Sequence, residues 1–110
     1  MLPKSQRLNL KKDFKWVAAG KKLETKYLKL FIKSGENQTA RVGIALSSKN
    51  FKNAIERNRA KRITAQAFQS VYPSLPKNIN IVALPKTGIL SVKSSELEKE
   101  LKELNEKIIS

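Results

Sequence analysis

The 110-residue sequence contains no cysteine and no histidine. Without cysteine there is no disulfide framework, no thiolate nucleophile and no cysteine-ligated zinc, and without histidine the usual general base and the commonest metal ligand are absent. Acidic residues are also few: outside the last fifteen positions they are Asp13, Glu24, Glu36 and Glu56, each standing alone. A metal-dependent nuclease needs clustered carboxylates, so we expect no catalytic residue, no cofactor and no metal held by the protein itself.

Long apolar runs are absent as well. No stretch approaches the roughly 18 residues that read as a membrane span, and the first ten residues lack the apolar segment of a secretory signal. We therefore expect a cytoplasmic protein with no membrane partner. The length suits one compact domain that covers residues 1–110.

Most of the charged residues in the sequence are basic. The chain has 23 Lys and Arg against nine Asp and Glu, a formal net charge of +14. Residues 1–95 hold 20 basic and four acidic residues, net +16, whereas residues 96–110 hold three basic and five acidic residues, net −2. Such an imbalance causes self-repulsion unless an anionic partner offsets it. A polyanion such as nucleic acid is the first candidate.

Helices are predicted from apolar residues spaced three and four positions apart. This spacing occurs over residues 11–19, over residues 53–72, and from Ser95 to the end, where Ser95 and Glu98 form a capping box. The second helix carries an apolar stripe of Ala60, Ile63, Thr64, Ala67 and Val71, and the last helix a stripe of Leu97, Leu101, Leu104 and Ile108.

Strands are predicted from alternation of apolar and polar residues. Residues 27–33 and 40–47 alternate on either side of turn-forming residues 35–37, which favours an antiparallel hairpin. The apolar run 79–84 predicts a buried strand. The order is helix, two or three strands, helix, strand, helix, so the fold class is a small α+β sandwich in which a sheet packs against helices.

The second helix also carries the densest basic run. Arg57, Asn58, Arg59, Lys61 and Arg62 lie on the face opposite its apolar stripe. Like charges four residues apart lower helix stability in the absence of a ligand, and Arg can bind phosphate with two parallel hydrogen bonds. We predict an RNA-binding surface formed by Lys52, Arg57, Asn58, Arg59, Lys61 and Arg62. The alternative is a solvated helix face.

A second group combines aromatic rings with lysines. Tyr27, Lys29, Phe31 and Lys33 are predicted on one face of the first strand, an arrangement that lets bases stack on rings while ammonium groups follow the backbone. The alternative is ordinary packing of the sheet under a helix. Phe14 and Trp16 of the first helix could extend the platform, but about 200° of helix rotation separates them, so the two rings cannot be buried equally.

Taken together, these segments resemble the protein subunit of bacterial ribonuclease P. The resemblance covers nearly the whole chain. It rests on Arg7-Leu8, Asp13-Phe14, Arg41-Val42-Gly43-Ile44, Ser48-Lys49, the run from Ala54 to Arg62, Ala67-Phe68, Ile81-Val82-Ala83 and Leu97 to Leu101. An Arg-Asn-Arg-x-Lys-Arg helix that follows an R-V-G-I strand is a specific combination.

The resemblance implies an αβββαβα domain like domain 2 of ribosomal protein S5, with a left-handed β-α-β crossover against the usual rule. It implies a tRNA 5′ endoribonuclease in which the RNA subunit performs hydrolysis with Mg²⁺, one RNA paired with one protein. The partners are then ribonuclease P RNA and the 5′ leader of precursor tRNA. The leader cleft takes in Phe14, Phe31, Ser48 and Lys49, to which the aromatic and basic face adds Trp16, Tyr27, Lys29 and Lys33.

Two other classes of protein share the size and charge of this chain. A structural RNA-binding protein of ribosomal type would have no effect on cleavage of precursor tRNA. A module that binds an acidic protein or an anionic membrane would keep its partner after nuclease treatment.

Overall fold

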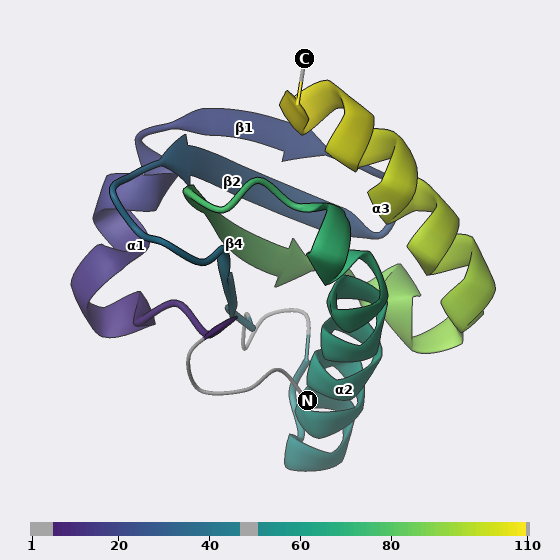
Figure 1. The fold of residues 1–110 in the computed structure, drawn as a ribbon. Coiled ribbons are helices and arrows are strands. Elements are labelled where there is room, and N and C mark those ends of the chain that lie inside the picture. Colours follow the sequence, from purple (N-terminus) through teal and green to yellow (C-terminus); the bar gives the residue numbers. More distant parts are fainter. Residues whose placement is uncertain (1–5, 47–50, 110) are drawn as a thin grey trace.

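The computed structural model describes residues 6–46 and 51–109. The order of elements is α-β-β-β-α-β-α, as predicted (Figure 1). The elements are α1 (Leu10–Ala18), β1 (Lys21–Glu24), β2 (Leu28–Ser34), β3 (Arg41–Ile44), α2 (Ala54–Val71), β4 (Ile79–Pro85) and α3 (Ser94–Ile109), with short 3-10 turns at Tyr72–Ser74 and Thr87–Ser91. No helix among these residues is long and apolar enough to cross a membrane.

The four strands form one mixed sheet in the order β1-β2-β4-β3. Strand β2 runs antiparallel to both β1 and β4, whereas β3 runs parallel to β4. The predicted hairpin between residues 27–33 and 40–47 is therefore wrong, because β4 lies between these two strands. Alternation in a sequence indicates which face a side chain takes, but it does not identify the neighbouring strand. The almost fully buried β4 takes an interior position, between β2 and β3.

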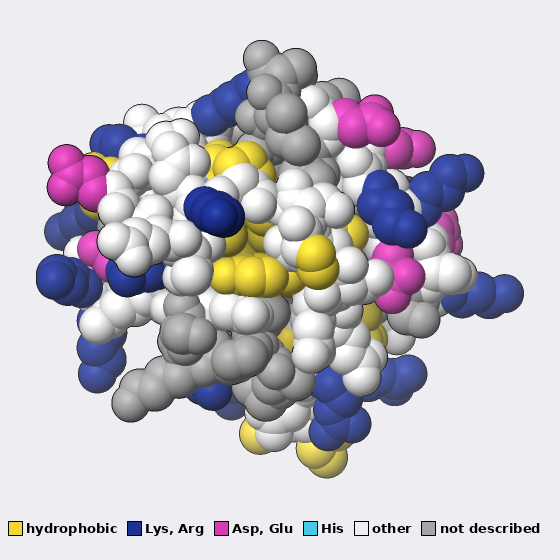
Figure 2. Space-filling model, in the orientation of Figure 1, with side chains coloured by type: hydrophobic (Ala, Val, Ile, Leu, Met, Phe, Trp, Pro, Cys, Tyr) yellow, Lys and Arg dark blue, Asp and Glu magenta, His cyan; other side chains and the backbone are white. Residues whose placement is uncertain are grey.

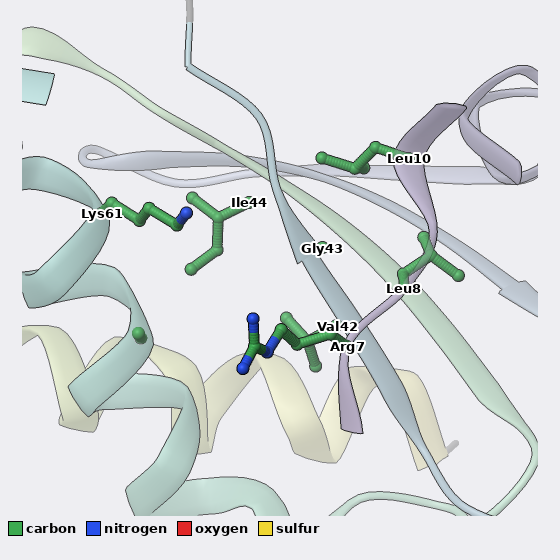
Figure 3. Close-up of a pocket in the computed structure, with 8 residues that line it drawn as sticks. Arg7, Leu8, Leu10, Val42, Gly43, Ile44 and Lys61 are labelled. Carbon is green, nitrogen blue, oxygen red and sulfur yellow. The ribbon is translucent and has the colours of Figure 1, made fainter. Parts of the chain in front are cut away.

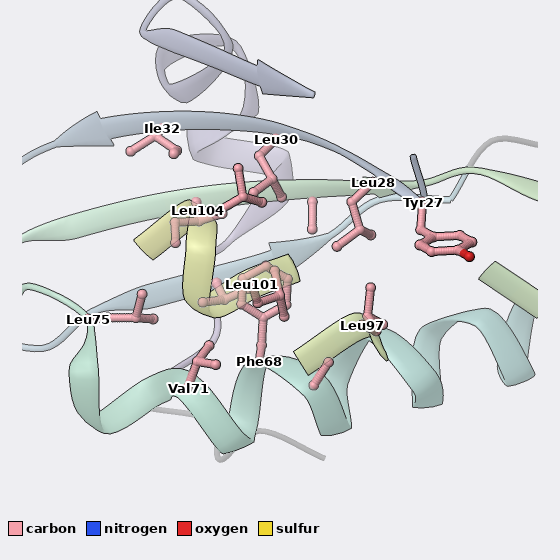
Figure 4. Close-up of a cluster of buried hydrophobic side chains, with 14 of the residues drawn as sticks. Tyr27, Leu28, Leu30, Ile32, Phe68, Val71, Leu75, Leu97, Leu101 and Leu104 are labelled. Carbon is pink, nitrogen blue, oxygen red and sulfur yellow. The ribbon is translucent and has the colours of Figure 1, made fainter. Parts of the chain in front are cut away.

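Helices cover both faces of the sheet (Figure 1). On one face β2 and β4 pack against α2 and α3 to form the larger core (Figure 4). Its members include Leu28, Leu30, Ile32, Ile81, Phe68, Val71, Leu97, Leu101 and Leu104. On the other face α1 packs through Val17 onto Val82, with Phe14 and Phe31 partly buried beside them. Leu28, Leu30 and Ile32, which alternate along β2, thus all face the larger core.

The ends of the helices differ slightly from the predicted ones. Helix α3 begins at Ser94, and the Lys93 carbonyl accepts hydrogen bonds from the N–H groups of Glu96 and Leu97, both at 3.1 Å. Ser95 thus lies inside the first turn, and the prediction that it caps the helix is wrong. The burial predicted for Leu97, Leu101 and Leu104 is confirmed, whereas the side chain of Ile108 lies outside the described residues.

Candidate nucleic-acid interface

Helix α2 presents its basic face to solvent because its other face is locked into the core. Asn53 caps the helix: its Oδ1 accepts from the Glu56 N–H at 2.8 Å, and its Nδ2 donates to Glu56 Oε1 at 2.6 Å. Thr64 is fully buried and donates to the Ala60 carbonyl at 2.8 Å. With Phe68 also buried, the rotation of the helix about its axis is set.

The outward face consists of the residues predicted to bind RNA. Arg57, Asn58, Arg59, Lys61 and Arg62 are all exposed, and Lys52 is exposed just before the helix. Within residues 6–46 and 51–109, none of these cations has a carboxylate partner, whereas Lys86 on another element is paired with Glu24. The positive charge of this face is therefore left to an external partner.

The α1 side of the sheet carries two lysine–aromatic pairs along β2. The Lys29 ammonium lies 5.6 Å from the centre of the Phe31 ring, and the Lys33 ammonium lies 4.9 Å from that of Trp16. Phe14 and Phe31 are half-buried between α1 and the sheet, whereas Trp16 is 40% exposed. The unequal burial predicted for Phe14 and Trp16 is confirmed.

Tyr27 does not share this face, so the prediction that it lies on one face with Lys29, Phe31 and Lys33 is wrong. It is 8% exposed and belongs to the larger core, where its hydroxyl donates to Glu96 Oε1 at 3.1 Å (Figure 4). The backbone bends before β2, because Thr25 Oγ1 accepts from the N–H groups of Tyr27 and Leu28. The alternation that begins at Leu28 therefore does not extend back to Tyr27. Ser48 and Lys49, predicted for the leader cleft, lie outside the described residues.

A pocket of about 160 Å³ lies between β3, α2 and the segment before α1. The nitrogen ends of Arg7 and Lys61 both point into this space (Figure 3). Gly43 allows Leu10 to pack closely against β3 beside the pocket, since a Cβ atom at position 43 would lie 2.7 Å from Leu10 Cδ2. Of the residues that line this pocket, only Lys61 was predicted from the sequence to contact a ligand. The sequence signal available for the rest was the small residue Gly43 between Val42 and Ile44.

The carboxylates with shifted pKa values lie on other elements. A hydrogen bond and the charge of Lys86, with Nζ 3.0 Å from Glu24 Oε1, lower the pKa of Glu24 on β1. Burial, followed by the charge of Glu96, raises the pKa of Glu100 on α3. In the described part of the chain no three acidic residues converge in a way that could hold a metal ion.

Lysine and arginine side chains surround the outline of the molecule, whereas acidic side chains gather mainly at the right, where α3 lies, and at the left edge (Figure 2). This distribution agrees with the net charge of +16 in residues 1–95 and −2 in residues 96–110. The site combines a basic helix face, a row of lysine–aromatic pairs and a pocket with two cations. Such a combination can bind a polyanion that has unpaired bases.

The chain is similar in sequence and in structure to known proteins. The family model described as Ribonuclease P matches residues 2–109. The ribonuclease P protein component of Desulforapulum autotrophicum is 32% identical over 108 residues, which cover 97% of this chain and 92% of that protein. The component from Chlamydia muridarum is 40% identical over 91 residues, covering 81% and 75%. The RNase P protein structure from Thermotoga maritima matches with a TM-score of 0.79 at 25% identity, covering 92% of this chain and 96% of that one.

Proposed function

The chain belongs to the bacterial ribonuclease P protein family, and from this membership we propose that it binds the catalytic RNA of ribonuclease P and the 5′ leader of precursor tRNA, and so assists leader removal. The main support for the proposal is the basic face of α2. Its four cations are exposed, and among the described residues they have no carboxylate partners.

Contact with the catalytic RNA is assigned to this face. Arg57, Arg59 and Arg62 can each grip a phosphate through two parallel hydrogen bonds. Asn58 among them can donate to a phosphate, a 2′-hydroxyl or a base edge. Because Asn53 caps the helix and Phe68 anchors it in the core, the side chains start from a fixed backbone, so less conformational entropy is lost on binding.

Contact with the leader is assigned to the α1 side of the sheet. Phe31 offers a half-exposed ring with the Lys29 ammonium 5.6 Å from its centre, and Phe14 lies beside it in the same small core. An unpaired base can stack on such a ring while the lysine pairs with a phosphate. Arg7 and Lys61 at the pocket between β3 and α2 supply positive charge between the two surfaces.

The protein contributes position and electrostatics to the reaction. We assign phosphodiester hydrolysis to the RNA subunit with Mg²⁺ held mainly by RNA phosphates, because hard cations of this kind prefer such oxygen ligands. Binding the catalytic RNA and the leader at once makes substrate recognition partly intramolecular. The expected consequences are a lower KM and a lower Mg²⁺ requirement.

The test is cleavage of precursor tRNA by a bacterial ribonuclease P RNA at low Mg²⁺, with and without the protein. We expect protein-dependent cleavage at the mature 5′ end. Replacing Arg57, Arg59 and Arg62 together with Ala should weaken assembly with the RNA by about a thousandfold or more, since charged hydrogen bonds of this kind contribute roughly 1.5–3 kcal/mol each, with little change in the thermal midpoint.

The matched control replaces three exposed lysines at the start of and along α3, Lys93, Lys99 and Lys102, with Ala. It removes the same charge from another element, and we expect near-normal assembly. If the folded protein gives no stimulation with its cognate RNA, the proposal fails in favour of a structural RNA-binding role. Normal assembly of the triple arginine variant would exclude the α2 face.

A further inference from the structure

Trp16, the single tryptophan of the chain, is held in place although it faces solvent. Its side chain is 40% exposed, yet the Lys33 ammonium lies 4.9 Å from the ring centre. The far edge of the ring lies against Gly35, where a Cβ atom would come within 2.9 Å of Trp16 Cη2. A larger residue at position 35 would displace the ring, so glycine leaves room for it.

The turn beneath the ring is itself tied to the sheet. Asn37 Nδ2 donates to the carbonyls of Thr39 at 2.7 Å and Ile79 at 3.2 Å. The buried Asn80 donates to Asn37 Oδ1 at 2.9 Å and to the Lys33 carbonyl at 3.2 Å. Trp16 thus rests on a support that is connected to the interior strand β4, and a ring ordered in this way loses little entropy on binding.

The pairing of Trp16 with Lys33 repeats the pairing of Phe31 with Lys29. Lys29, Phe31 and Lys33 alternate on one face of β2, so Lys33 lies about 7 Å beyond Phe31 along the strand. A single strand that stacks on Phe31 and continues in this direction reaches Trp16 next. Aromatic rings beside cations are the combination that binds unpaired bases regardless of their sequence.

The electrostatic surroundings suit a polyanion. Lys12 and Lys15 of α1 are exposed on the turns next to Trp16, against the carboxylates of Asp13 and Glu36 in the same neighbourhood. Together with Lys33 the cations outnumber the carboxylates. An acidic ligand with a flat, unpaired ring system fits both the charge and the indole surface.

We propose that Trp16 and Lys33 form a stacking site for one unpaired RNA base, one step beyond Phe31 along β2. The site rests on the proposed function, because it extends the path of a single-stranded leader. It is distinct from the surface at Phe14 and Phe31, since those rings pack against the small core whereas Trp16 is 40% exposed and lies outside that core. A purely structural role, in which Trp16 only fastens α1 to β2, is the competing explanation.

Because Trp16 is the single tryptophan, its fluorescence reports this site in the unmodified protein. The probe is an end-labelled oligouridine of about ten nucleotides, within the usual range of site sizes. Anisotropy of the label measures overall binding, and tryptophan emission measures contact at Trp16. We expect both signals to titrate together, with emission quenched and Trp16 protected from iodide.

Two variants separate stacking from charge. Trp16→Leu keeps an apolar side chain and should weaken oligouridine binding about tenfold, with the dependence of log K on log salt unchanged. Lys33→Gln should make that slope shallower by about 0.7, the value for one phosphate of a single strand. Lys102→Gln on α3 is the matched control and should leave both affinity and slope unchanged.

The outcomes distinguish this inference from the proposed function. Rising anisotropy with unchanged Trp16 emission and unchanged affinity of Trp16→Leu would overturn the stacking site and leave the proposed function standing. If Trp16→Leu lowers the thermal midpoint but binds normally, the role of Trp16 is structural and the inference fails. Absence of any oligouridine binding by the folded protein would count against leader binding itself.

Discussion

Two glutamates of this chain have pKa values shifted in opposite directions by their neighbours. Glu24 is paired with Lys86, which lowers its pKa. The pKa of Glu100 is raised by burial and then by the charge of Glu96, with a hydrogen bond from Thr25 acting in the opposite direction. In the described part of the chain Glu100 Oε2 is buried without a hydrogen-bond partner. The charged form of Glu100 is thus a local source of instability.

We predict that Glu100→Gln stabilises the protein at neutral pH, by up to about 1 kcal/mol because solvent screens a partly exposed charge. A carboxyl with a raised folded-state pKa holds its proton longer in the folded state, so wild-type stability falls as pH rises through that pKa. The comparison is urea denaturation at pH 7 and pH 4, and the stabilisation should disappear at pH 4. Glu24→Gln is a control with the opposite pH dependence. The favourable pairing of Glu24 with Lys86 exists above the pKa of Glu24 and is lost on acidification, so this variant should lose stability at pH 7. Equal effects of Glu100→Gln at both pH values would contradict the prediction.

At the scale of the element, α2 serves both the core and the proposed RNA contact. Its buried face includes Ala60, Ala67 and Phe68, and its basic residues lie on the exposed side. The first turn, which leads into Arg57, depends on the reciprocal hydrogen bonds between Asn53 and Glu56. Loss of that cap leaves N–H groups of the first turn without an internal partner.

We predict that Asn53→Ala lowers the free energy of unfolding by about 1 kcal/mol. Asn53→Ser, which keeps an oxygen acceptor at the cap, should recover most of the loss. Urea denaturation followed by circular dichroism measures both. If Ala and Ser at this position give equal stability, the side-chain cap does not support α2.

At the scale of the whole molecule, the charge is divided between a basic body and a mildly acidic C-terminal region. Residues 1–95 carry net +16 and residues 96–110 net −2. Affinity for RNA should therefore depend strongly on salt, because each neutralised phosphate releases counterions. The uneven distribution should also orient the protein as it approaches RNA, with α3 turned away.

For about six phosphate contacts, log K for the catalytic RNA should fall against log salt with a slope of roughly −4 to −5. The variant lacking Arg57, Arg59 and Arg62 should have a slope shallower by about 2 to 3, on the same basis. Filter binding at several salt concentrations provides the measurement. A steep slope that the triple variant leaves unchanged would place the phosphate contacts elsewhere on the molecule.

Several local features could be predicted because they depend on residues close together in the chain. Helix periodicity places Phe14 and Val17 on one face of α1, and Leu97, Leu101 and Leu104 on one face of α3. It likewise places the basic residues between Arg57 and Arg62 on the exposed face of α2. The unequal burial of Phe14 and Trp16 follows from the same geometry. Tyr27 could not be placed correctly, because hydrogen bonds to Thr25 bend the chain just before β2.

The α+β order, the basic face of α2 and the excess of positive charge could be derived from the sequence, since periodicity and composition are local properties. The position of β4 between β2 and β3, the meeting of Arg7 and Lys61 at a pocket, and the contact of Trp16 with Gly35 beside Lys33 depend on the three-dimensional fold. These contacts join residues far apart in the chain. They are selected by how the buried faces of all the elements fit together, which no single segment encodes.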